Sequence, residues 1–546
     1  MKEKPSRHPL MQQNLLDKAI AYVAPKMAQQ RMMARAQLAL AGGYTGARRD
    51  RSQLSGWNPG TGSPTTDIIS DLPELRARSR DQMRNAPVAV GAINTSVSHI
   101  VGTGLSCTPA IDYKRLGMTE EAAEAWCEDV RFRFETWALS TDCDLARNLN
   151  FYGIQSLAQR TWFESGDAFV LTPRVARAGR SAQLALQLLE ADRICNPNRT
   201  PDTDTLIDGI ELAEETGETV AVHVARKHPG DYRSTGNTWT RVSVRGTQTG
   251  RRNVLHLFEP LRPGQVRGVP WIAPILEPLK QLNRWTDNEL NAAVTSSIFS
   301  VFLKMDADAF DNLFNDKDAD TLLNTASENR NKLQQSGQAV NLLPGESIET
   351  ASMNRPNPEF DPFWVAIVRQ MGMALEVPYE VLVMHFQSSY TAARGALLMA
   401  WKFFKRKRDM LATQLCQPVY ELWLADDIAE GRTSAPGFFA NPVVRAAWSK
   451  SIWTGDGPGS VDPQKEVAAA RERVDMEIST LDAESMLHDG VDWKTKHAQR
   501  TREVAAQKRD GTYIPKAGAA ADANPQQDQT DPPEPPPAQR KPRAPN

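Results

Sequence analysis

Two helical segments that bracket a short strand-containing insert constrain the fold of this chain more than any other sequence feature. Residues 271–298 carry apolar side chains at helical spacing, with prolines only in the opening turns, where a helix tolerates them. Residues 353–383 carry a second apolar stripe, which Pro378 terminates. Residues 299–352 between them read as a small α/β insert. This order predicts an antiparallel helical stalk with a small domain at its tip.

The rest of the chain indicates several units of mixed helix and strand. A chain of 546 residues is too long for one compact core. Helical patterns at 72–99 and 119–163 precede a strand-rich block, and a further long helix is expected over 394–430. The predicted fold class is therefore α+β and multi-domain. The expected strands lie in GDAFVLTPR, ALQLLEADRI, DGIELA, TVAVHVARKH and NVLHLFEP, with ETGE as a hairpin turn.

The two ends of the chain differ from its body in composition. Residues 1–60 form a basic arm with an Ala- and Met-rich helix that Pro25 interrupts. Such an arm fits contact with nucleic acid or with an acidic protein surface, and it equally fits a solubilising disordered arm. Residues 511–546 are rich in Pro and polar residues, and they are expected to be disordered because they bury too little apolar surface to fold.

Charge and cysteine usage argue against several classes of protein. A net charge of −2 is unlike that of a protein that simply coats DNA. No apolar run approaches the roughly 18–20 residues of a membrane span, so no membrane partner is expected. The N-terminal segment lacks the apolar core and cleavage site of a secretory signal. The five cysteines are scattered without a CxxC pair, which favours buried thiols in a reducing compartment.

Sequence motifs for catalysis, cofactors and metals are also missing. The sequence contains no GxxxxGK[ST] phosphate loop, no GxSxG and no HExxH, and its eight histidines show no metal-ligand spacing. Asp142 and Asp144 flank Cys143 like a metal pair, but without a third nearby carboxylate a cap at a helix boundary is the better interpretation. We therefore predict no catalytic residue, no cofactor and no metal site.

Five stretches of the chain are informative when they are taken together. They are RARSRDQMRNAPVAVGAINTSVSHIVGTGL (76–105), FESGDAFVL (163–171), HLFEPLRPGQVRGVPWIAPIL (256–276), SSYTAARGALL (388–398) and VDPQKEVAAARERVDMEISTL (461–481). In this order they closely resemble the portal proteins of lambda-type tailed bacteriophages, and the resemblance covers about residues 70–510.

The resemblance implies what the chain does and where it acts. It implies a dodecameric ring at one capsid vertex, through which double-stranded DNA enters during packaging and leaves during ejection. The implied partners are the terminase large subunit, the major capsid protein and the head–tail connector proteins. The protein would belong to the virion, would assemble in the cytoplasm of the bacterial host, and would need no enzymatic activity.

The resemblance also implies a division of the chain into the parts of a portal subunit. The N-terminal arm (1–60) and the Pro-rich tail (511–546) lie outside it. The parts between them are a mixed α/β wing (61–270), a first stem helix (271–298), a small α/β clip (299–352), a second stem helix (353–383), a tunnel loop (384–393), a long helix returning to the wing (394–430) and a helical crown-like segment (431–510).

A run of five bases directly behind Trp401 is the most unusual charged feature of the body. Lys402, Lys405 and Arg406 share one face of the expected helix, whereas Trp401 and Phe404 share another. A ring would multiply every inward-facing base, and a full inward cluster would hold DNA too tightly to let it move. We predict that the two aromatic residues are core, that most of the bases pair with acids of a neighbouring subunit, and that at most one or two line the bore.

The loop before this helix matches the place where portal families carry a tunnel loop. Its short polar side chains suit a surface past which DNA slides, and an ordinary turn between helices, with Thr391 as a cap, is the alternative. In the stem, Trp285 and Asn288 face either a neighbouring subunit or only the stem core. The DNA-channel candidates are Ser388, Ser389, Tyr390, Lys402, Lys405 and Arg406, and the subunit-contact candidates are Lys407, Arg408, Trp285 and Asn288.

Two other classes of function remain open at the level of sequence. A phage-encoded nuclease or protease acting during head maturation would need clustered carboxylates or a nucleophile beside a base. A monomeric adaptor would use the basic N-terminal arm alone. A closed ring in electron micrographs is expected only for the portal.

Overall fold

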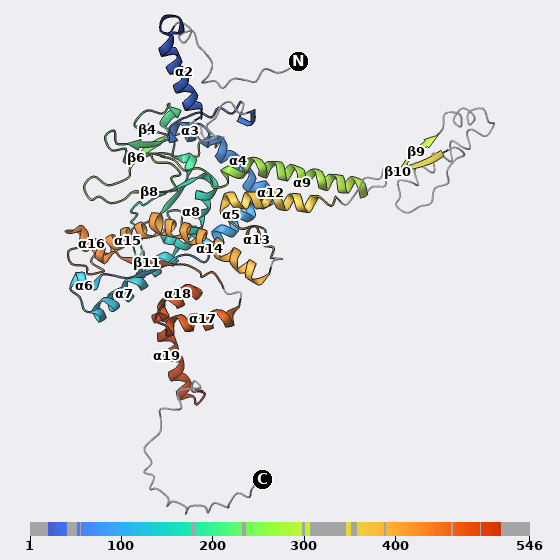
Figure 1. The fold of residues 1–546 in the computed structure, drawn as a ribbon. Helices are drawn as coiled ribbons and strands as arrows, with labels where there is room; N and C mark the ends of the chain where they lie inside the picture. The colour runs from blue at the N-terminus through green and yellow to red at the C-terminus, as the bar shows by residue number, and fades with distance from the viewer. Residues whose placement is uncertain are drawn as a thin grey trace, which may run out of the picture. The chain divides into compact units, whose positions relative to one another are not determined.

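The chain divides into two compact units, residues 1–67 and residues 68–546. Its architecture is α+β, as predicted, with many helices and several small antiparallel sheets (Figure 1). The computed structural model describes residues 20–40, 52–54, 56–176, 178–179, 182–231, 236–297, 301–305, 346–350, 357–386, 389–459, 462–491 and 493–514.

The described part of the first unit consists of helices and a loop at residues 56–63. α2 (Pro25–Leu40) starts at a proline, which suits a first helical position because that amide needs no partner. The predicted interruption of the arm helix at Pro25 is therefore confirmed. η3 (Ser52–Leu54) follows, and α3 (Pro64–Ile69) crosses into the second unit. Residues 1–19 and 41–51 of the predicted arm lie outside the described residues.

Helices make up most of the second unit, and the helical pattern at 72–99 is divided at Pro87 into two of them. The helices are α4 (Leu72–Asn85), α5 (Pro87–Ile100), α6 (Tyr113–Leu116), α7 (Glu120–Leu139), α8 (Phe151–Ser165), α9 (Leu276–Ser297), α12 (Phe360–Leu375), α13 (Tyr379–Leu382), α14 (Tyr390–Leu411), α15 (Gln417–Ala429), α16 (Pro442–Trp448), α17 (Pro463–Asp475), α18 (Leu481–Asp489) and α19 (Trp493–Arg509).

The helical pattern predicted over 119–163 forms two helices rather than one. Asn150 caps α8 by accepting a hydrogen bond from the Gly153 amide, so the second helix has its own start. In the turn between them, Asp144 accepts hydrogen bonds from the backbone amides of Ala146, Asn148 and Leu149. The prediction that this aspartate caps backbone rather than binding metal agrees with these bonds.

The strands expected between residues 166 and 260 are present, and ETGE joins β5 to β6 as an antiparallel pair. The short strands β4, β7 and β11 were not predicted. The sheets are β3–β2–β8, the meander β4–β5–β6–β7, and the pairs β1–β11 and β9–β10. The strands are β1 (Ser106–Pro109), β2 (Asp167–Leu171), β3 (Gln187–Glu190), β4 (Leu206–Ile207), β5 (Ile210–Leu212), β6 (Thr219–Ala225), β7 (Trp239–Ser243), β8 (Val254–Phe258), β9 (Val301–Met305), β10 (Glu346–Thr350) and β11 (Ser451–Thr454).

The predicted stalk consists of α9 and α12, which lie side by side (Figure 1). The Trp285 ring of α9 packs against Phe360 and Phe363 of α12, with centroids 4.7 and 4.9 Å away. The short turn η7 (Ala273–Ile275) precedes α9. In the insert, β10 pairs antiparallel with β9.

The long helix expected over 394–430 starts a few residues earlier, with α14. A π-helical turn at Ala412–Cys416, labelled η8, joins α14 to α15. Pro418 follows at the start of α15 and has no amide to donate to the helix, which accounts for the irregular turn before it. The chain therefore continues in one direction through α14 and α15 despite the proline.

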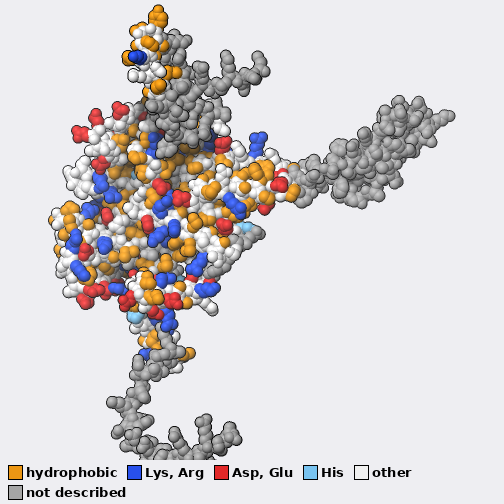
Figure 2. All heavy atoms as spheres, in the orientation of Figure 1, with side chains coloured by type: hydrophobic (Ala, Val, Ile, Leu, Met, Phe, Trp, Pro, Cys, Tyr) orange, Lys and Arg blue, Asp and Glu red, His pale blue; other side chains and the backbone are white. Residues whose placement is uncertain are grey.

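The largest core lies where α5, α7, α8 and α15 meet. The Phe134 ring of α7 contacts Tyr420 and Trp423 of α15 edge-on, at centroid distances of 5.3 and 5.2 Å. Val130 and Trp137 of α7 are buried in the same cluster. On the face drawn in Figure 2, acidic, basic and apolar side chains of the described residues are interspersed.

Candidate functional site

The basic run of α14 is divided between two faces of the helix. Lys402, Lys405 and Arg406 are exposed, whereas Lys407 and Arg408 are buried. This division follows from the helical period, because residues three and four apart share a face. The five bases therefore occupy two different environments and serve different purposes.

The aromatic residues beside these bases form the inner side of α14. Phe404 is buried, as predicted, and its ring stacks on His99 at 4.8 Å between centroids. Phe403 is buried as well, which was not predicted. Trp401 is only half-buried, so the prediction that it is core holds in part.

Lys407 is held inside its own chain by one carboxylate and three aromatic rings. Its Nζ pairs with Glu259, which lies just after β8. The same nitrogen lies 5.8 Å from the Trp162 centroid, 6.0 Å from Phe163 and 5.6 Å from Phe403. These distances suit cation–π attraction, so the buried ammonium is stabilised by the Glu259 carboxylate and by three aromatic rings.

Arg408 completes the C-terminal end of α5. Its Nε donates to the Ile100 carbonyl and its Nη2 to the His99 carbonyl, both at 2.8 Å. A cation at this position satisfies two carbonyls that the helix leaves open and also matches its dipole. Burial lowers the pKa of Arg408, and the nearby Asp456 opposes this shift.

Four residues were predicted to contact a neighbouring subunit. Lys407 and Arg408 are buried and bonded within one chain, and their contact with a neighbour stays a prediction. Trp285 packs on α12, which is the stem-core alternative of its prediction. Asn288 is exposed on α9, and its contact with a neighbour stays a prediction.

Two of the three exposed bases of α14, Lys402 and Arg406, lie beside a groove that α12, α13 and α14 form together. Arg406 pairs with Glu376, Nη2 to Oε1 at 2.8 Å, across this groove. Lys402 and Arg406 both line it. Lys402 and Lys405 have no ion-pair partner within the described part of the chain, so their charges are available to a molecule outside it.

The predicted tunnel loop is only partly described. Ser389 is exposed, occupies the position just before α14, and caps the helix with its backbone rather than its side chain. Tyr390 is the first residue of α14, and Ser388 lies outside the described residues. The assignment of these three residues to a DNA channel therefore stays a prediction.

A buried ion network in the predicted wing was missed by the sequence reasoning. Asp167, at the start of β2, accepts from Arg267 Nε at 2.6 Å and from Arg76 Nη2 at 3.1 Å. His256 Nε2 lies 3.3 Å from its Oδ2. Burial alone would raise the pKa of Asp167, but the two guanidiniums and the His256 contact lower it overall.

This network connects three of the sequence stretches that carry the family resemblance. Arg76, Asp167 and Arg267 come one from each stretch, and the charged strand residue Asp167 within apolar neighbours was the available signal. Gly166 and Gly268 let these segments approach. A Cβ on Gly268 would lie 1.9 Å from the Gly166 carbonyl oxygen, so no other residue fits.

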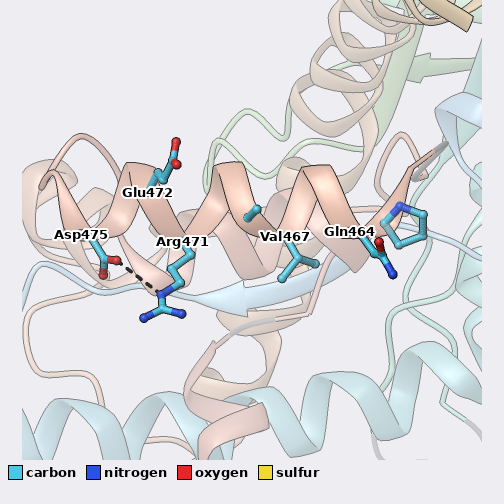
Figure 3. A pocket seen from close by; sticks show the side chains of 7 residues that line it. Gln464, Val467, Arg471, Glu472 and Asp475 are labelled. Atoms are coloured by element: carbon cyan, nitrogen blue, oxygen red, sulfur yellow. Dashed lines mark ion pairs between the residues drawn. The ribbon is translucent and has the colours of Figure 1, made fainter. Parts of the chain in front are cut away.

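The helix α17 opens the fifth of these stretches as predicted. Asp462 caps it by accepting from the Lys465 amide, and Pro463 occupies the first turn. A shallow depression runs along its exposed side, where Val467 and the Arg471–Asp475 ion pair lie (Figure 3). On its inner side, Glu466 lies 3.8 Å from Arg394 of α14, which links the fourth and fifth stretches.

The described residues hold no group of three His, Cys, Asp or Glu side chains placed to bind a metal ion. Among the described helices, none is long and apolar enough to cross a bilayer.

A family model described as "Phage portal protein, lambda family" matches residues 50–408. Two curated relatives are similar over most of the chain. Portal protein B of Escherichia phage lambda is 25% identical over 506 residues, which cover 88% of this chain and 92% of that protein. A probable portal protein of Halomonas phage phiHAP-1 is 24% identical over 463 residues, covering 84% of this chain and 85% of that protein.

One solved structure that the chain matches comes from the neck of an empty gene transfer agent particle. It aligns with a TM-score of 0.42 and 13% identity, covering 74% of this chain and 99% of that chain. The family model and the curated relatives are portal proteins, so nothing in these comparisons supports the nuclease or protease alternative.

Proposed function

This chain belongs to the lambda family of phage portal proteins, and from this premise we propose that twelve copies close into a ring around a channel for double-stranded DNA. The ring occupies one capsid vertex, admits the genome during packaging and releases it during ejection. The channel itself performs this task, and no enzymatic activity of the chain is involved.

The observation that carries this proposal is the apolar surface that the stem leaves uncovered. Leu290 and Val294 of α9 are 63% and 54% exposed, and Phe363 and Met373 of α12 are 54% and 75% exposed. Apolar side chains gathered on two neighbouring helices mark an interaction surface. Because the two surfaces differ, contact between copies is head-to-tail, which closes into a ring when the rotation between copies allows it.

The channel contacts DNA through few charges per copy. Only Lys402, Lys405 and Arg406 of the basic run are exposed, because Lys407 and Arg408 are used inside the chain. Each phosphate that a base neutralises adds a salt-dependent contribution to binding, and a ring repeats it in every copy. We assign one or two of these three bases, with Ser388, Ser389 and Tyr390, to the channel surface.

The other parts of the chain meet the remaining partners. The clip (299–352) docks the terminase large subunit during packaging and the head–tail connector proteins afterwards. The wing (61–270) contacts the major capsid protein, and the crown-like segment (431–510) lies inside the head. The protein is then a virion component that assembles in the cytoplasm of the bacterial host. These assignments rest on family membership.

Electron microscopy of the purified chain tests the proposal. Closed rings with a central hole are the expected result, and a phage lacking the gene should build heads that contain no genome. Solitary particles at micromolar concentration, or heads that fill normally without the protein, would overturn it.

A further inference from the structure

A groove at the base of the stem has no occupant within the described chain. It measures about 850 Å³ and is formed by the end of α12, the start of α13 and the middle of α14. Met373 and Met399 flank it and are 75% and 70% exposed, and the buried ring of Phe403 also lines it. Such an apolar recess suits a large apolar side chain.

The charges around this groove further restrict its occupant. Three bases line it, Arg369, Lys402 and Arg406. Two acids, Glu376 and Glu380, line it as well, and Glu376 is already paired with Arg406. Arg369 lies over the Tyr379 ring at 5.3 Å, so a cation–π contact already exists there. An aromatic ring combines an apolar body with a face that attracts cations, and it therefore fits both the recess and its basic rim.

The loop after α13 carries side chains of this kind. Met384 and Phe386 are 69% and 48% exposed. Met384 has a φ of 54°, a left-handed conformation that costs a residue with a Cβ about 1 kcal/mol or more. The chain therefore keeps two apolar side chains in water on a strained turn, which indicates that a partner covers them.

The geometry of a closed ring identifies which loop enters which groove. Neighbouring copies in a closed ring are related by rotation about one axis. Two surfaces that touch between copies therefore lie at the same height along that axis. The groove and the loop both lie at the C-terminal end of α12. The exposed Leu290 and Val294 of α9 cannot be the occupants of this groove. Trp285 of α9 contacts Phe360 at the N-terminal end of α12, and Leu290 and Val294 lie farther along α9, away from the groove.

We propose that Phe386 and Met384 of one copy insert into the groove between Met373 and Met399 of the next copy. This inference rests on the proposed ring. The aromatic ring of Phe386 then lies beside Lys402 and Arg406, which fixes these two bases beside the loop of the neighbouring copy. The contact couples the position of each loop to the charged face of the adjacent α14.

Cross-linking between two singly substituted chains tests this contact. Met373→Cys and Phe386→Cys chains with different tags are co-expressed, purified as rings and treated with a short bis-maleimide. We expect a covalent dimer that carries both tags, and neither variant alone should give it. The matched control pairs Met373→Cys with Val443→Cys, which is also exposed but lies on α16, and it should give no such dimer.

The outcomes separate this inference from the proposed function. Rings without a mixed dimer overturn the groove contact and leave the ring intact, whereas failure of the unsubstituted chain to form rings overturns both. As a second measurement, Phe386→Ala should raise at least tenfold the protein concentration at which half of the chains form rings, while Phe386→Tyr should leave it within about twofold. An unchanged concentration for Phe386→Ala contradicts the proposal.

Discussion

The Asp167 network and the exposed face of α14 use similar charged side chains in opposite ways. Around Asp167, two arginines and a histidine surround one fully buried carboxylate, and every charge has its partner in the same chain. On α14, Lys402 and Lys405 face solvent without an ion-pair partner within the described part of the chain. The comparison shows that buried charges paired within the chain stabilise the fold, whereas exposed charges without an ion-pair partner are available to other molecules.

The largest expected effect comes from breaking the buried network. Asp167→Ala leaves Arg76 and Arg267 buried with the partly exposed Asp208 as their remaining ion-pair partner, which should cost about 3 kcal/mol of unfolding free energy. Thermal unfolding at a fixed protein concentration measures the loss. Glu74→Ala is the matched control, because its partner Arg78 is exposed, and it should change stability by less than about 0.5 kcal/mol. Equal melting of the two variants would contradict the assignment.

The next prediction compares two lysines that lie two positions apart. Lys407→Ala removes the buried ammonium that pairs with Glu259 and contacts the surrounding aromatic rings. The free energy of unfolding should fall by about 2 kcal/mol. Lys405→Ala removes an exposed side chain and should change stability by less than about 0.5 kcal/mol. Urea unfolding of both variants measures these free energies. A larger loss of stability for Lys405→Ala than for Lys407→Ala would contradict the assignment of Lys407 to the buried face of α14 and Lys405 to its exposed face.

Removing the three exposed bases of α14 should weaken DNA binding and leave the stability of the chain unchanged. The triple variant Lys402→Ala, Lys405→Ala, Arg406→Ala should bind a double-stranded oligonucleotide at least about tenfold more weakly, with a shallower dependence on salt. Fluorescence anisotropy at several salt concentrations measures both quantities. If the affinity and its salt dependence match those of the unsubstituted rings, these residues do not contact DNA.

The smallest effect is expected at the ion pair that borders the groove. Glu376 ends α12 in the left-handed region, with a φ of 58°, where glycine is the usual residue. Glu376→Gly relieves backbone strain but loses the exposed pair with Arg406, so stability should rise by up to about 1 kcal/mol. Glu376→Ala loses the pair and keeps the strain, and it should not be stabilised. A melting experiment that ranks alanine above glycine would contradict this account.

Local sequence patterns predicted much of the fold because helices and strands depend on near neighbours. The apolar period located α9, α12 and α14, and the separation of Lys402, Lys405 and Arg406 from the aromatic face follows from the same period. Pro87 and Asp462 marked helix starts through rules that need only a few adjacent residues. The order of five stretches was enough to indicate the portal family.

Contacts between distant segments could not be predicted in this way. The short strand β11 pairs with β1, and β10 pairs with β9, although nothing local specifies either partner. Lys407 and Arg408 looked equally free in the sequence, because their partners Glu259 and Ile100 lie far away along the chain. Whether a charge is buried depends on what the folded chain places around it. Helical periodicity predicts only the face of the helix on which the side chain lies.

The sequence by itself therefore determined the portal family, the order of helices and strands, and the face of α14 on which each base lies. Only the tertiary structure decided which bases are enclosed, which carboxylate holds Arg76 and Arg267 together, and which apolar side chains remain uncovered at the base of the stem. The physical reason is that a helix follows from interactions within a few residues, whereas an ion pair or a groove requires segments from distant parts of the chain to meet.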